Sequence, residues 1–224
     1  MSNELDLQEQ EQLDALKAFW KQYGNLITWV LVLALGAFAA WNAWNYYQRD
    51  QALKAGAMFD ELDRAAQAGD AEKAARVFAD LQSRYPGTTY AAQGGLLAAR
   101  VQFDKGQADG AKASLNWVAE KASEEELRSI AHLRLAGLLL EAKQFDEALK
   151  QIDAAKAPGF EALAADRRGD VLQAQGKPAE AVAAYQAAWK AMDEKTEYRR
   201  LVEFKLTALG AAPAPAAAAS GAAQ

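Results

Sequence analysis

Cysteine is absent from this sequence of 224 residues. The chain therefore has no disulfide framework, no thiolate metal site and no cysteine nucleophile. It also has no cysteine that could carry a lipid, which excludes the anchor of a bacterial lipoprotein. The absence suits an oxidising compartment but does not require one.

Histidine is almost as scarce, and His132 is the single example. It lies in an apolar stretch, whereas a proton-transfer histidine needs a partner and a cleft. The sequence has no phosphate-binding loop, dinucleotide fingerprint or cluster of metal ligands. Gly94-Gly95 is not followed by a basic residue, so we interpret it as a site of close helix packing. We expect no enzyme activity, no cofactor and no metal.

Clusters of basic residues are also missing. The chain has 25 Lys and Arg against 30 Asp and Glu, which gives a formal net charge of −5. Binding to a phosphate backbone needs clustered basic side chains, so we expect no nucleic-acid partner.

Runs of Val, Ile and Thr are few, whereas Ala, Leu, Glu, Lys and Gln are abundant. The abundant residues are good helix formers, and the scarce ones are those that favour sheet. The composition therefore predicts an all-α protein.

One long apolar run is present, because no charged residue lies between Lys21 and Arg49. As a helix, residues 26–47 would be about 33 Å long, enough to cross a hydrocarbon core of about 30 Å. Aromatic residues flank this run, as they do at membrane interfaces. They are Trp20 and Tyr23 at one end and Trp41, Trp44, Tyr46 and Tyr47 at the other. The run predicts a transmembrane helix over residues 25–48.

A cleaved signal peptide is the alternative interpretation, since Ala37-Phe38-Ala39 fits a signal-peptidase site. A signal peptide begins with a short basic stretch, however, and this chain begins with a long acidic one. We therefore favour an uncleaved anchor. Lys17 and Lys21 precede the span and Arg49 and Lys54 follow it, so the positive-inside rule leaves the orientation open.

A repeated pattern follows the anchor. Alanines recur at positions 74, 111, 148 and 181, with a larger residue four positions later and an apolar or small residue seven positions later. Five positions before the alanines lie Gly69, Gly106, Lys143 and Gly176. The intervals of 37, 37 and 33 residues between the alanines predict stacked pairs of antiparallel helices, with close contact at the alanines and turns at the glycines.

The pattern resembles the tetratricopeptide repeat, although the tryptophan and tyrosine usual in its first helix are missing. In the last unit the matching residues are Gly169, Gly176, Ala181, Tyr185 and Ala188. The resemblance implies an α-solenoid over residues 49–209. Its final capping helix is expected over residues 197–209, with Leu201, Phe204 and Leu209 facing inward. Residues 210–224 are expected to form a disordered Ala/Pro tail.

The order of parts over nearly the whole chain resembles the YfgM-like family of ancillary SecYEG translocon subunits. The most specific piece is residues 11–24, EQLDALKAFWKQYG, directly before the span. The resemblance implies a bacterial inner-membrane protein with residues 1–24 as a cytoplasmic amphipathic segment and a periplasmic repeat domain. It also implies association with SecYEG, with a PpiD-like membrane-anchored chaperone and with secreted client proteins.

The first helices of such repeats line a concave groove that binds protein chains. The matching positions in this sequence are Gln93, Leu96, Arg100, Phe103, Leu133, Gly137, Leu140, Asp166, Asp170 and Gln173. Phe103 and Leu140 occupy equivalent positions in neighbouring units and predict apolar patches.

We compare three candidate functions against these features. The first is a translocon-associated, chaperone-like binding protein, and the second is a periplasmic adaptor for envelope assembly or cell division. The third is an enzyme, against which the missing catalytic residues argue.

Overall fold

The structure is a computed structural model that describes residues 3–213, with side chains from Glu9 onward. The chain divides into two units, Met1–Gln51 and Ala52–Gln224. Residues 1–2 and 214–224 lie outside the described part, so most of the expected tail does too. Within residues 3–213 the structure contains nine α-helices and no β-strand. The expected all-α fold is confirmed.

The first unit contains the greater part of α1 (Asn3–Gln67). From Glu9 onward most of its apolar side chains are exposed, among them Leu33 at 69% and Trp41 at 63%. Thr28 Oγ1 donates to Gly24 O at 2.8 Å, and Asn42 Nδ2 donates to Phe38 O at 3.1 Å. These two polar side chains are thus satisfied by carbonyls of their own helix. In the described part of the chain, α1 is the one helix long and apolar enough to cross a membrane.

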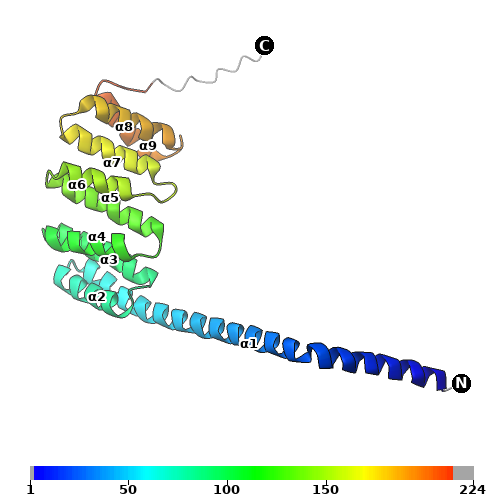
Figure 1. The fold of residues 1–224 in the computed structure, drawn as a ribbon. Helices are drawn as coiled ribbons and strands as arrows, with labels where there is room; N and C mark the ends of the chain where they lie inside the picture. Colours follow the sequence, from blue (N-terminus) through cyan, green and yellow to red (C-terminus); the bar gives the residue numbers. More distant parts are fainter. Residues whose placement is uncertain (1–2, 214–224) are drawn as a thin grey trace, which may run out of the picture. The chain divides into compact units, whose positions relative to one another are not determined.

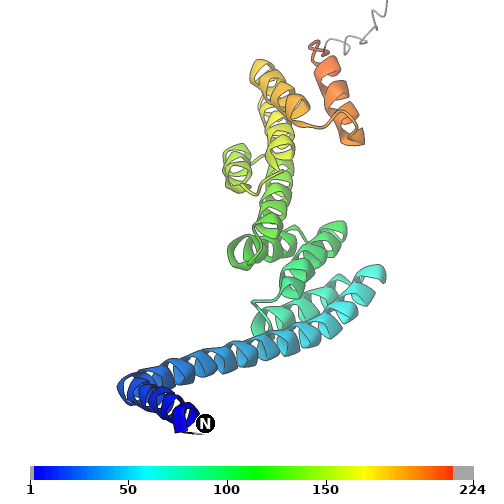
Figure 2. The ribbon, with the colours of Figure 1, turned by 90° about the vertical axis from the view of Figure 1, so that its right-hand side faces the viewer.

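The second unit, called the repeat domain below, begins with residues 52–67 of α1. The helices that follow are α2 (Ala71–Arg84), α3 (Thr89–Asp104), α4 (Ala108–Lys121), α5 (Glu125–Glu141), α6 (Phe145–Ala154), α7 (Glu161–Ala174), α8 (Pro178–Ala191) and α9 (Glu197–Ala208). From α2 to α9, consecutive helices pack against each other in chain order (Figures 1 and 2). The first helices of neighbouring pairs also touch, α3 with α5 and α5 with α7, so they form one continuous layer.

The repeat register predicted from the alanines is confirmed. Ala74, Ala111, Ala148 and Ala181 are all 0% exposed. The larger residues four positions later are buried as well, namely Phe78, Leu115, Ile152 and Tyr185. Each second helix therefore turns the same stripe toward its neighbours, because residues four apart lie on one face of a helix.

The four helix pairs close with the same turn. Gly69, Gly106 and Gly176 have φ angles of 67°, 75° and 75°, and Lys143 adopts 57° at the equivalent position. At each turn the next residue donates its N–H to a carbonyl five residues back, at 2.8 to 3.0 Å. This bond satisfies a carbonyl that the helix end would leave unpaired. The left-handed conformation favours glycine. Lys143 adopts it although it has a side chain, so this turn keeps the geometry of the others without the glycine.

Helices approach closely at two of the helical glycines. A Cβ at Gly95 would lie 2.4 Å from Val118 Cγ2, and a Cβ at Gly169 would lie 2.4 Å from Tyr185 Cε1. The interpretation of Gly94-Gly95 as a packing site is confirmed, since the nearest atoms are apolar side chains.

The inward face predicted for α9 is wrong at Leu201 and Phe204. Leu201 and Phe204 are 46% and 71% exposed, whereas Val202 and Leu206 are 0% exposed and join the cluster around Tyr185. Leu209 is half-buried against the same cluster. The prediction followed the largest apolar side chains. Lys205, between the two stripes, instead contacts the carboxylates of α7 and orients the helix.

Candidate functional site

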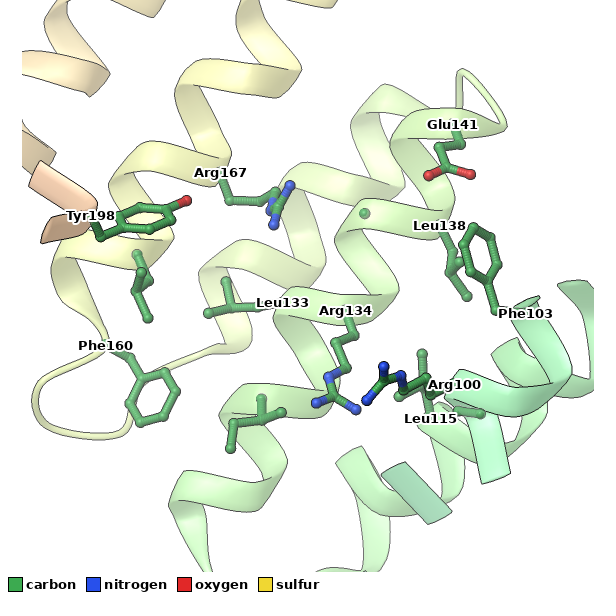
Figure 3. Close-up of a pocket in the computed structure, with 14 residues that line it drawn as sticks. Arg100, Phe103, Leu115, Leu133, Arg134, Leu138, Glu141, Phe160, Arg167 and Tyr198 are labelled. Carbon is green, nitrogen blue, oxygen red and sulfur yellow. The ribbon is translucent and has the colours of Figure 1, made fainter. Parts of the chain in front are cut away.

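The repeat domain has a groove of about 600 Å³ on the layer formed by its first helices (Figure 3). Residues of α3, α4, α5, α7 and α9 and the segment before α7 line it. On α5 the lining residues are Ile130, Leu133, Arg134, Gly137, Leu138 and Glu141. Their spacing of three and four residues places them along one face of the helix.

The walls of the groove combine apolar and polar side chains. Phe103 of α3 and Leu163 of α7 are each 39% exposed there. Leu133, Leu138 and Phe160 are half-buried. Apolar side chains left partly open in a concave surface favour contact with a protein chain over a small polar ligand.

Three arginines and one glutamate give the groove its charge, namely Arg100, Arg134, Arg167 and Glu141. Arg134 Nη1 donates to the Leu96 carbonyl at 3.1 Å, which fixes this side chain against α3. Partial burial, together with the nearby charge of Arg100, lowers the pKa of Arg134 from its usual value. Arg167 pairs with Asp170 at 3.4 Å, and Arg100 lies 3.9 Å from Asp104.

Arg100, Phe103, Leu133 and Gly137 are the sequence-predicted residues that the structure brings together in this groove. Gln93 is exposed on α3 outside the lining set. Leu96 is 7% exposed and belongs to the core, and its carbonyl anchors Arg134. Leu140 packs on the cluster of Ala136, Ala148, Ile152 and Val171 instead of lining the groove. The repeat period equates Leu140 with Phe103, but Leu138 and Glu141 take the groove face of α5.

The three predicted residues of α7 serve the fold. Asp166 is 1% exposed, and its carboxylate accepts hydrogen bonds from Lys205 Nζ at 2.8 and 2.9 Å and from the Tyr198 hydroxyl at 2.7 Å. Asp170 accepts from Lys205 at 2.7 Å and from the Tyr185 hydroxyl at 2.8 Å, and Gln173 Oε1 lies 2.9 Å from that hydroxyl. These bonds join α7 to α8 and α9 and occupy groups that a ligand would need.

The same network changes the acidity of two tyrosines. Burial raises the pKa of Tyr185 and of Tyr198, and hydrogen bonds to Asp170 and Asp166 raise them further. A phenol that donates to a carboxylate resists losing its proton, because the product would be two adjacent negative charges. Both hydroxyls therefore act as donors in the fold.

Sequence reasoning missed most of the groove lining, including Arg134, Phe160, Leu163, Arg167 and Tyr198. Arg134 lies one residue after Leu133, so the stripe of α5 could have revealed it. Phe160 precedes α7 and Tyr198 lies on the capping helix. A repeat period cannot find residues that lie outside the repeated helices.

His132 is half-buried on α5, where its Nδ1 lies 2.7 Å from Gln151 Oε1 of α6. Its partner is thus an amide on a packed helix pair, and His132 does not line the groove.

A family model described as "Tetratricopeptide repeat-like domain" matches residues 17–211. A solved structure of MamA resembles the fold with a TM-score of 0.50, at 17% identity over 66% of this chain and 84% of that chain. The fold and the repeat register thus define a tetratricopeptide-like repeat protein.

Relatives narrow the class further. The chain is 32% identical over 205 residues to an ancillary SecYEG translocon subunit of Neisseria gonorrhoeae, covering 91% of this chain and 98% of the relative. It is 33% identical over 184 residues to the subunit of that name in Escherichia coli, covering 81% and 87%. The chain belongs to the family of ancillary SecYEG translocon subunits.

Proposed function

We propose that this chain is an ancillary subunit of the SecYEG translocon and binds proteins without covalent chemistry. The observation that carries the proposal is the match to relatives of that name along nearly their whole length. The uncovered apolar helix supports a place in the membrane, where its exposed side chains would contact lipid or a partner helix.

The proposed arrangement in the bacterial inner membrane has four parts. Residues 1–24 form a cytoplasmic amphipathic segment, and residues 25–48 cross the membrane once. Residues 49–209 form a periplasmic repeat domain, and residues 210–224 form its tail. This orientation rests on the family, because the charges that flank the span are balanced.

The groove is the proposed contact surface for polypeptide. The apolar side chains in its walls and its place on the first helices fit a chaperone-like scaffold that holds secreted proteins as they emerge. A PpiD-like membrane-anchored chaperone is the second proposed partner of the repeat domain. Because Phe103 is partly open and lies on one wall, it is the groove residue best suited to report such contacts.

Photo-crosslinking in cells tests the proposal. A photoreactive residue at Leu33 is expected to crosslink to a SecYEG subunit. One at Phe103 is expected to crosslink to emerging secreted proteins or to the chaperone, and the yield should fall when translation stops. Phe204, which is 71% exposed on α9, is the control for collisions at an exposed apolar side chain.

Two outcomes count against the proposal. If Leu33 yields no SecYEG crosslink, the association fails, and envelope-assembly or cell-division proteins at the same position would favour the adaptor function. If Phe103 and Phe204 give the same products, the groove is not the binding surface.

A further inference from the structure

Three arginines but only one carboxylate, Glu141, line the groove, although the protein as a whole is acidic with a net charge of −5. Arg167 has a partner in Asp170 at 3.4 Å. Arg100 and Asp104 lie 3.9 Å apart with side chains 73% and 61% exposed, a distance and exposure at which an ion pair contributes little. Among the described residues, Arg134 forms no ion pair with a carboxylate.

Arg100 and Arg134 face each other in the groove. Figure 3 shows the guanidinium groups of Arg100 on α3 and Arg134 on α5 pointing toward one another in the groove. The bond from Arg134 Nη1 to the Leu96 carbonyl holds this guanidinium in place, and its other N–H donors have no hydrogen-bond partner among residues 9–213. Two like charges at close range repel, and an anion between them relieves the repulsion. Guanidinium groups match the geometry of a carboxylate well.

Apolar side chains lie on both sides of the arginine pair. Phe103 and Leu138 lie together on one side, and Leu133 and Phe160 line the groove on the other (Figure 3). An inorganic anion would leave these walls in contact with water. A polypeptide with an acidic side chain between apolar side chains would cover both the charges and the walls.

We propose that the groove selects an extended polypeptide segment with an Asp or Glu flanked by apolar residues, its carboxylate accepting hydrogen bonds from Arg100 and Arg134. This inference rests on the proposed function, since it names the chemistry of the chain that the groove holds. It adds a preference that apolar contact alone would not give.

The test measures binding of labelled peptides to the full-length protein in detergent by fluorescence anisotropy. Three short peptides differ only in a central Glu, Gln or Lys, with Leu and Phe on both sides. The Glu peptide is expected to bind about 10-fold more tightly than the Gln peptide at low salt, because charge-assisted hydrogen bonds are about twice as strong as neutral ones. The Lys peptide is expected to bind most weakly. The preference for Glu is expected to shrink as salt screens the charges.

Substitutions assign the preference to the arginines. Arg100→Gln together with Arg134→Gln should bring the Glu peptide down to the affinity of the Gln peptide and leave the Gln peptide unchanged. Arg100→Glu should turn the preference toward the Lys peptide. Arg100 is largely exposed, so variants at this position alone are expected to fold. They keep the inference testable if the Arg134→Gln variant unfolds because it loses the bond to the Leu96 carbonyl.

Arg76→Gln is the matched control, because Arg76 on α2 is 70% exposed and also lies 3.9 Å from a carboxylate one turn away. It should leave all three affinities unchanged. Equal binding of the Glu and Gln peptides to the unmodified protein would overturn the inference, and so would a Glu preference that survives Arg100→Glu. If the span still crosslinks to SecYEG in either case, the proposed function stands and the acidic preference alone falls.

Discussion

Gly169 and Gly137 are both helical glycines, but their surroundings differ. A Cβ at Gly169 would lie 2.4 Å from Tyr185 Cε1, whereas a Cβ at Gly137 would have nothing within 4 Å. Gly169→Ala should therefore lower the free energy of unfolding by about 1–3 kcal/mol, because overpacking outweighs the gain in helix propensity. Gly137→Ala should raise it by about 0.5–1 kcal/mol. Thermal melting followed by circular dichroism compares them, and equal shifts would contradict the packing at Gly169.

Lys205 is the positive centre of the network that joins α9 to α7. Its amine contacts Asp166 and Asp170, and the side chain of Asp166 is 2% exposed. Lys205→Met would leave a buried carboxylate without its cation, so stability should fall by about 3–5 kcal/mol. Lys190→Met on exposed α8 surface is the control and should change stability by no more than about 0.5 kcal/mol. Denaturant unfolding measures both, and a mild effect at Lys205 would mean that water replaces the amine.

At the scale of elements, the turn between α5 and α6 has the same backbone geometry as the other three turns but a different residue at its left-handed position. Lys143 adopts a φ of 57° where they have glycine, and a left-handed side-chain residue costs about 1–2 kcal/mol. Lys143→Gly should therefore raise stability by about 0.5–1 kcal/mol after the flexibility of glycine is subtracted. The reverse change, Gly106→Lys, should lower it by a similar amount. A Cβ at Gly106 has open space, so backbone strain alone is measured. In chemical denaturation the two variants should change the free energy of unfolding in opposite directions. Changes in the same direction would contradict the shared turn geometry.

The packing of α9 distinguishes its two apolar stripes. Val202 is 0% exposed and Phe204 is 71% exposed. Val202→Ala should lower stability by about 1–3 kcal/mol, since it deletes buried methyl groups and leaves a cavity. Phe204→Ser should change it by no more than about 0.5 kcal/mol, although the removed side chain is larger. If Phe204→Ser proved the more damaging in thermal melts, the face of α9 described above would be reversed.

At the scale of the whole molecule, anchoring and orientation are two separate predictions, each tested by its own measurement on cells. The mature protein should begin near Ser2 and stay in the membrane after carbonate washing, because an uncleaved apolar helix holds it. Protease added outside spheroplasts should degrade the repeat domain and spare the segment before the span. A cytoplasmic protein is the control for intact cells. An N-terminus at Ala40 would favour the cleaved signal peptide, and a protected repeat domain would reverse the orientation.

The buried half of each repeat could be predicted because it is periodic. Ala74, Ala111, Ala148 and Ala181 repeat a local requirement, which is that two helices approach closely, and a local requirement leaves a pattern in the sequence. The groove was predicted less completely. Arg100, Phe103 and Leu133 follow the repeat, but Leu140 turns to the core, since α5 has apolar residues on several faces. Periodicity alone does not choose among such faces.

The sequence by itself determined the uncharged span, the helical class and the alternation of alanine, large residue and glycine. These depend on residues close together in the chain, where 3.6-residue periodicity and turn chemistry act. The tertiary structure decided which face of α9 is buried, that Asp166 serves Lys205 and Tyr198, and that Arg134 meets Arg100 across two helices. The physical reason is that burial and charge pairing are properties of helices packed together. A carboxylate on α7 becomes structural or available for binding according to which cation the packing of α9 brings beside it.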